Sequence, residues 1–212
     1  MITLDIFSDP ICPWCYIGKA YLDRALEARP EHPFEIRWRP YLLNTNMPAG
    51  GMERRTYLEA KFGGQQGAVN AYLPVTEHAQ KAGLSLNLES IGRTPNTVDA
   101  HRLIHWGALE GRQTAVISAL FRAYFKEGRD IGNAAILCAI ATEAGLDGKI
   151  IARLLATDQD QDEIIERATA AREMGVTSVP TSIIAGEHVI PGAQPPQTWL
   201  QVIDELSTQS RL

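Results

Sequence analysis

Residues 9–19 read DPICPWCYIGK, so that only Pro13 and Trp14 separate Cys12 from Cys15. Two cysteines at this spacing can supply half of a zinc site, take part in a framework of structural disulfides, or form a redox-active pair. The chain has three cysteines in 212 residues, which is too few, and odd in number, for a disulfide framework. Zinc normally takes four ligands, and a single CxxC supplies two. The sequence therefore favours a redox-active dithiol.

The motif stands where a strand is expected to end and a helix to begin. ITLDIF (2–7) has the length and β-branched content of a buried strand. Over 14–29, apolar residues recur at three- and four-residue spacing, as in an amphipathic helix. The third cysteine, Cys138, lies in the apolar run AILCAIA and is expected to be a small buried hydrophobic residue.

This placement assigns a role to each residue of the motif. A thiolate at a helix N-terminus is stabilised by unpaired N–H groups and by the helix dipole. We expect Cys12 to be the exposed nucleophile, and Cys15, in the first turn, to point inward and resolve the mixed disulfide. Pro13 can start the helix without an N–H, and Trp14 is expected to give the site an apolar rim free of cations.

The rest of the chain has strand-like ends and a helical middle. FEIRWRPYL (34–42) alternates apolar and polar residues like a strand, and short apolar runs at 180–186 and 187–192 indicate a hairpin. Helical periodicity dominates from 52 to 175, and a closing helix is expected over 194–206.

This order predicts an α/β fold with a large helical insertion. The strand-bearing domain comprises 1–43 and 176–212, and the insertion comprises 44–175. Within the insertion, one helix is expected to take Thr94 as its N-cap and Pro95 as its first helical residue.

A second signal is GVTSVPTSII (175–184). Thioredoxin-like folds place a cis-proline opposite the CxxC pair, just before a strand, and Val179-Pro180 has that context. We therefore expect this bond to be cis and to face Cys12. Edge-strand pairing with an extended peptide needs backbone groups beside the sulfurs, so Val179 and Pro180 are expected to contact the substrate. Pro13 and Trp14, between the two cysteines, are also expected to contact it.

These motifs resemble those of DsbA-like thioredoxin-fold oxidoreductases of the cytoplasmic FrnE type. The resemblance runs nearly end to end, through SDPICPWCYIGK, RWRPYLLNTNMP, RTPNTVDAHRLIHW, LFRAYFKEGRDIGN, EMGVTSVPTSII and IPGAQPP. It implies a thioredoxin-like fold whose helical middle is the inserted domain. The superfamily includes 2-hydroxychromene-2-carboxylate isomerases and kappa-class glutathione transferases, in which a serine tends to stand at the position of Cys12. Retention of both cysteines favours dithiol chemistry.

One position departs from the thioredoxin pattern. Many thioredoxins carry a buried acid six residues before the nucleophile, where this chain has Ile6. Asp5 is expected to face the opposite side of the strand, and Asp9 is interpreted as a loop or cap residue rather than a proton carrier. How Cys15 loses its proton is left open.

Other polar candidates are interpreted as structural. His101 and His105 are four residues apart on one predicted helix, but Arg102 follows the first and no third ligand is visible, so no metal site is predicted. Asn44 and Asn96 lie in segments that contribute to the glutathione pocket of the isomerase and transferase relatives. Both fit equally well as turn or first-turn residues, so they are left out of the site.

Composition limits the partners. The net charge is −5 and no Lys/Arg-rich run occurs, which disfavours nucleic acid and anionic membranes as ligands. No signal-like or membrane-spanning segment stands out, so a cytoplasmic location is expected. The predicted function is thiol–disulfide exchange with a disulfide-containing protein or a small-molecule thiol. No cofactor is expected, although glutathione could serve as a co-substrate. The main alternative is a glutathione-dependent isomerase or transferase acting on a small electrophile. A further alternative is a non-enzymatic binding module whose CxxC is vestigial or holds a metal.

Overall fold

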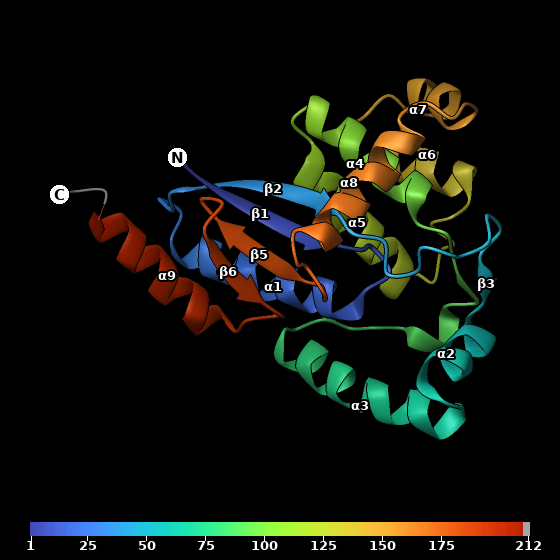
Figure 1. Ribbon diagram of the computed structural model, residues 1–212, viewed down its shortest axis with the longest axis horizontal. Helices are drawn as coiled ribbons and strands as arrows, with labels where there is room; N and C mark the ends of the chain where they lie inside the picture. The colour runs from blue at the N-terminus through green and yellow to red at the C-terminus, as the bar shows by residue number, and fades with distance from the viewer. Residues whose placement is uncertain (210–212) are drawn as a thin grey trace.

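The computed structural model describes residues 1–209, and its centre is a four-stranded mixed sheet (Figure 1). The strands are β1 (Ile2–Ser8), β2 (Phe34–Pro40), β5 (Thr181–Ile184) and β6 (His188–Pro191), in the order β2-β1-β5-β6. β1 runs parallel to β2, whereas β5 is antiparallel to both β1 and β6. The sheet therefore joins the two ends of the chain.

Each strand is close to its predicted range: β1 extends one residue further, to Ser8, and the other three are shorter than predicted. Leu4, Ile6 and Phe7 of β1 are buried, and Leu4 lies opposite Ile184 of β5. The strand expected over 34–42 ends at Pro40, where the chain turns away and the N–H of Tyr41 donates to Ser8 O. The apolar runs at the two chain ends are thus the material of one sheet.

Two helices pack together along the sheet, and the other helices gather at one of its ends. The helix after β1, α1 (Pro13–Ala28), packs against the closing helix α9 (Pro196–Gln209). At the carboxyl ends of β1 and β2 the remaining long helices gather, away from α9 (Figure 1). They are α2 (Arg54–Phe62), α3 (Gln65–Lys81), α4 (Val98–Leu109), α5 (Gln113–Phe125), α6 (Ala134–Glu143), α7 (Gly148–Leu155) and α8 (Gln161–Glu173).

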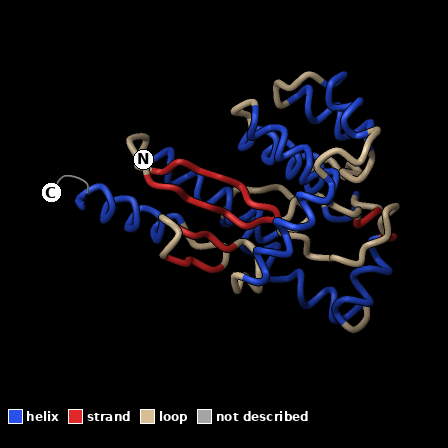
Figure 2. The backbone as a smooth tube through the Cα atoms, turned by 45° about the horizontal axis from the view of Figure 1, so that its top comes forward, coloured by secondary structure: helices blue, strands red, loops and turns tan. Residues whose placement is uncertain are grey.

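A short ribbon interrupts the helical part. Strands β3 (Met52–Glu53) and β4 (Arg93–Thr94) pair antiparallel, and Figure 2 shows them well away from the main sheet. A one-turn 3-10 helix, η1 (Leu88–Ser90), precedes β4. The prediction of Thr94 as a helix N-cap is therefore wrong, because its backbone pairs with Met52. Helix α4 begins instead at Val98, whose N–H donates to the side chain of Asn96 at 3.0 Å.

The sheet and the helical part share one core. A single cluster of buried side chains includes Leu4 and Trp199 beside the sheet and Leu103, Leu120 and Leu137 in the helices. The main sheet draws its strands from within 1–43 and 176–212, as the predicted division requires. The division into two domains stays a prediction, and its residues 210–212 lie outside the described residues. Among the described helices, none is long and apolar enough to cross a membrane.

Candidate active site

The two sequence motifs meet at the carboxyl end of β1. Cys12 is the N-cap residue of α1, Pro13 is its first helical residue, and the N–H groups of Cys15 and Tyr16 donate to Cys12 O. Cys12 Sγ lies 3.5 Å from Val179 O, although 167 residues separate the two. The Val179-Pro180 peptide bond is cis. Both thiols of the CPWC motif are free.

The prediction that Cys12 is exposed is wrong. Its relative exposure is 5%, against 1% for Cys15. Cys12 lies in the wall of a cavity of about 410 Å³, together with Pro13, Trp14 and Val179. The opposite wall comes from helices α2 and α3 of the helical part. Access to the Cys12 thiol therefore passes through this cavity, which nothing in the motif itself indicates.

Aromatic and apolar contacts hold α3 over α1. Tyr21 of α1 packs in a small cluster with Val75 and Ala79 of α3, and its hydroxyl donates to His78 O at 3.1 Å. The Trp14 ring meets the His78 ring edge-on, with centroids 5.2 Å apart. These contacts fix the helix that covers the cysteines.

The cavity also contains two cations, which corrects the expected cation-free rim. Arg54 and Lys61, both on α2, line it with Cys12. Arg54 is the first residue of α2, and the side chain of Glu53 caps this helix by accepting from two backbone N–H groups. The N–H of Arg54 donates to Gly92 O at 3.0 Å, beside the β3–β4 ribbon. The prediction considered only neighbours in sequence, whereas Arg54 and Lys61 lie 42 and 49 residues after Cys12 in the chain.

Cys15 has the surroundings of a resolving thiol. Burial and the neighbouring Cys12 thiol raise its pKa well above the usual value. The Ser8 hydroxyl and the backbone of Asp9 act in the opposite direction, and Ser8 Oγ makes no well-formed hydrogen bond with any described residue. Ile6, which stands in place of an acid, lines a small void beside Cys15, as does Pro180. Cys15 is therefore a protonated thiol near neutral pH.

Asp9 is fully buried and has the loop-fixing role inferred from the sequence. Its carboxylate accepts the N–H of Ile11 at 3.1 Å and that of Leu43 at 2.8 Å, so it ties the CPWC loop to the segment after β2. Thr97 Oγ1 lies 3.4 Å from Oδ2 of the same carboxylate. Burial raises the pKa of Asp9 to about 6, because the ionised form loses its hydration.

Two buried groups give opposite pH dependences. Asp9 holds its proton more tightly when folded, so its ionisation lowers stability as pH rises from about 4 to about 6. Burial lowers the pKa of His101 to about 4, so charging this imidazole lowers stability as pH falls from about 6.5 to about 4. Each contribution amounts to about 3 kcal/mol, and together they nearly cancel in the wild-type protein.

Asp9→Asn should expose the histidine contribution. We expect the free energy of unfolding of this variant to fall more steeply than that of the wild type as pH is lowered from 6.5 to 4.5. Urea unfolding of both proteins at three pH values, with the thiols kept reduced, measures the difference. Parallel curves for the two proteins would contradict the assignment of Asp9 as a buried titrating group.

The other sequence candidates lie outside the thiol pair. His101 Nε2 is 3.2 Å from Tyr41 O, whereas His105 Nδ1 contacts Arg167. The ligand atoms of His105, Asp160 and Glu163 lie within 4.8 Å of one another, and His101 is not part of this group. Asn96 holds Met47 O through its amide. Asn44 accepts the hydroxyl of Tyr57, a cavity residue, at 2.9 Å.

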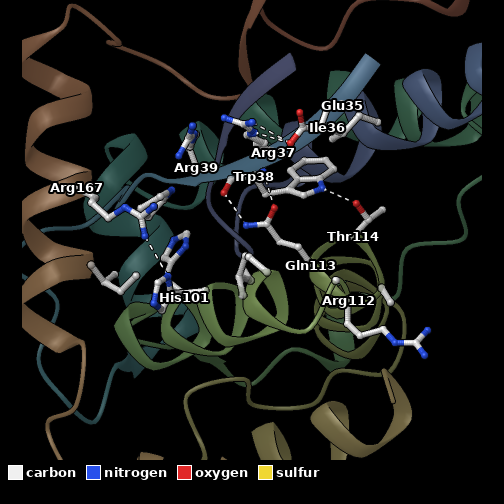
Figure 3. Close-up of a pocket in the computed structure, with 17 residues that line it drawn as sticks. Glu35, Ile36, Arg37, Trp38, Arg39, His101, Arg112, Gln113, Thr114 and Arg167 are labelled. Atoms are coloured by element: carbon white, nitrogen blue, oxygen red, sulfur yellow. Dashed lines mark hydrogen bonds and ion pairs between the residues drawn. The ribbon is translucent and has the colours of Figure 1, made fainter. Parts of the chain in front are cut away.

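A second cavity, of about 420 Å³, lies between the edge strand β2 and helices α4, α5 and α8 (Figure 3). The Gln113 side chain accepts the Trp38 N–H at 2.9 Å and donates to Trp38 O at 3.0 Å, so it occupies backbone groups of the strand edge (Figure 3). None of the described residues that line this cavity is a cysteine. The chamber over Cys12 is therefore the candidate active site.

Known proteins share this architecture. Residues 3–204 match the DSBA-like thioredoxin domain family. The uncharacterised protein YwbO of Bacillus subtilis is 29% identical over 195 residues, which cover 91% of this chain and 90% of that protein. A probable DsbA oxidoreductase from Streptomyces coelicolor superposes with a TM-score of 0.85 at 29% identity, covering 97% of this chain and 89% of the other.

A more distant solved structure has the same fold. The cytosolic disulfide reductase DsbM from Pseudomonas aeruginosa, solved with GSH, has a TM-score of 0.69 at 19% identity, covering 99% of this chain and all of that one. The paired cysteines at the start of α1, the mixed sheet and the match over nearly the whole chain lead to one conclusion. The chain belongs to the DSBA-like thioredoxin domain family.

Proposed function

We propose that this protein is a thiol–disulfide oxidoreductase that works through the Cys12–Cys15 dithiol. The observation that carries the proposal is the position of Cys12, at the N-cap of α1 with Cys15 one turn away and Val179 O 3.5 Å from its sulfur. The unpaired N–H groups of a helix start favour a thiolate. The likeness to a probable DsbA oxidoreductase at 29% identity supports the same chemistry.

The reaction consists of two exchanges. The Cys12 thiolate attacks one sulfur of a substrate disulfide, forms a mixed disulfide and expels the other sulfur as a thiolate. Cys15 then loses its proton and attacks Cys12 Sγ, which releases the second substrate thiolate and leaves an intramolecular disulfide. An external thiol reduces that disulfide and is itself oxidised. No resident cofactor enters this cycle, and glutathione fits the role of the external thiol.

A cytoplasmic location accords with this direction. A reducing compartment keeps the pair as the dithiol, so net reduction or isomerisation is favoured over net oxidation. The substrate is then a disulfide-containing protein or a small-molecule disulfide. Buried Cys12 favours substrates whose disulfide can enter the cavity.

The test compares two activities on the same protein. Reduction of insulin and of a small disulfide is measured with dithiothreitol as the reductant, and conjugation of glutathione to an electrophile is measured in parallel. Faster disulfide reduction than the uncatalysed control, with no conjugation above background, is the expected result. Conjugation without disulfide reduction would favour the glutathione-dependent isomerase or transferase instead.

A further inference from the structure

A buried arginine in the active-site cavity lacks a counter-ion. Arg54 has a relative exposure of 7% and lines the cavity with Cys12. Its Nη1 donates to Tyr124 OH and its Nη2 to Tyr72 OH, each at 3.1 Å. A guanidinium has five N–H donors, so three of them lack an acceptor among the residues that the structure describes. Over residues 1–209, no carboxylate lies within ion-pair distance of Arg54.

The two tyrosines do not neutralise this charge. Tyr124 OH donates to Arg93 O at 3.1 Å, so it is a protonated hydroxyl that accepts from Arg54. Burial raises the pKa of Tyr124 to about 12. Burial also raises the pKa of Tyr72, with Arg54 opposing and the neighbouring Cys12 adding to the rise. The guanidinium carbon lies 5.4 Å from the ring centroid of Tyr72 and 5.9 Å from that of Tyr124, which offsets part of the cost of burying the charge but supplies no anion. Among the described residues, this buried cation therefore has no paired anion.

The rest of the lining has the same sign. Lys61 stands at the exposed side of the cavity, where its Nζ donates to Tyr57 OH at 2.7 Å, and no described acid pairs with it. The described residues that line the cavity include these two cations and no aspartate or glutamate. The chain as a whole, by contrast, carries a net charge of −5. The positive lining is therefore local to the wall of the cavity opposite Cys12.

We propose that Arg54, assisted by Lys61, binds a carboxylate of a small disulfide substrate while Cys12 attacks its sulfur. The inference rests on the proposed function and specifies the class of substrate. A cavity of about 410 Å³ accommodates a small molecule, and a carboxylate accepts the forked N–H donors of a guanidinium. Tyr72 is oriented by Arg54 on the same wall, and its hydroxyl proton has no described acceptor, so it can donate to the same anion.

The reaction is balanced as for any disulfide. Cys12 forms a bond to the nearer sulfur, the substrate S–S bond breaks, and one carboxylate-bearing thiolate leaves. Cys15 displaces the second, and an external dithiol returns the two electrons. Arg54 touches the carboxylate rather than the reacting sulfurs, so its effect depends on the charge of the substrate.

Three small disulfides of different charge test this selectivity. They are 3,3′-dithiodipropionate, which is anionic, bis(2-hydroxyethyl) disulfide, which is neutral, and cystamine, which is cationic. With dithiothreitol as the reductant, kcat/KM should fall in that order for the wild-type protein. In Arg54→Gln, the ratio of kcat/KM for the anionic over the neutral disulfide should drop about tenfold or more, since hydrogen bonds to charged groups contribute about 1.5–3 kcal/mol.

Matched variants separate binding from folding. Arg153→Gln removes an exposed charge on α7, outside the cavity, and should leave the ratio unchanged. Arg54→Lys should keep part of the preference, and Lys61→Gln should lower the ratio by a smaller factor. If Arg54→Gln does not fold, the anion site is tested by the kcat/KM ratio of Lys61→Gln and by the order of the three disulfides for the wild-type protein.

The outcomes distinguish the two proposals. Reduction of the neutral disulfide without any preference for the anionic one would overturn the anion site and leave the proposed function standing. An unchanged ratio of kcat/KM in folded Arg54→Gln would also overturn the anion site. Failure to reduce all three disulfides would overturn the proposed function and this inference together.

Discussion

Cys12→Ser is expected to reduce disulfide turnover to the uncatalysed rate. A serine hydroxyl is not ionised near neutral pH and cannot form a disulfide, so the first exchange has no nucleophile. The remaining Cys15 cannot substitute, because it is 1% exposed and burial raises its pKa. The measurement is the rate of reduction of a neutral small disulfide with dithiothreitol, at equal concentrations of folded protein.

Cys15→Ser should behave differently. It keeps the nucleophile but lacks the resolving thiol, so the substrate should stay attached to Cys12 as a mixed disulfide that intact-protein mass spectrometry detects. Cys138→Ser is the matched control, since Cys138 is a partly buried residue of α6 that does not line the cavity. A loss from Cys138→Ser as large as that from Cys12→Ser, with the fold retained, would contradict the assignment of the pair.

Local patterns were enough to predict the thiol pair and the sheet. The β-branched run of β1 and the apolar spacing of α1 are determined by neighbouring residues, so Cys12 at their junction could be located from the sequence. Val179 was linked to it through the resemblance to a family, and the structure places Val179 O 3.5 Å from its sulfur. The order of residues along the chain was thus enough to locate the two thiols.

The covering of the site could not be predicted in this way. Arg54 and Tyr72 reach the cavity because α2 and α3 pack over α1, and no short-range periodicity encodes that contact. Thr94 has the sequence signature of a helix cap, but pairing with Met52 overrides it. Tertiary contacts thus changed both the exposure of Cys12 and the charge around it.

Arg102 shows the same effect for stability. From the sequence alone, Arg102 was considered only because its presence after His101 argues against a metal-binding motif. In the structure it is 2% exposed and donates through Nε to Gln159 O at 2.7 Å and through Nη2 to Leu154 O and Thr157 O at 2.9 and 2.7 Å. Its guanidinium thereby donates to carbonyls at the C-terminal end of α7 and in the segment between α7 and α8.

Arg102→Met is expected to lower the free energy of unfolding by about 3–5 kcal/mol. Methionine can fill part of the space and keep a contact with Trp106, whose ring lies 4.9 Å from the guanidinium carbon. It cannot donate hydrogen bonds, however, so three backbone carbonyls and the partly exposed Asp99 carboxylate lose the buried guanidinium as a donor.

Urea unfolding of reduced protein measures this loss, and Arg153→Met on the exposed face of α7 is the control, expected to change stability by less than about 0.5 kcal/mol. Arg102→Lys should also destabilise, because a single ammonium group cannot reach acceptors spread around a planar fork. A stability of Arg102→Met equal to that of the control would mean that water replaces the guanidinium at these carbonyls, and that the junction of α7 and α8 does not depend on a buried cation.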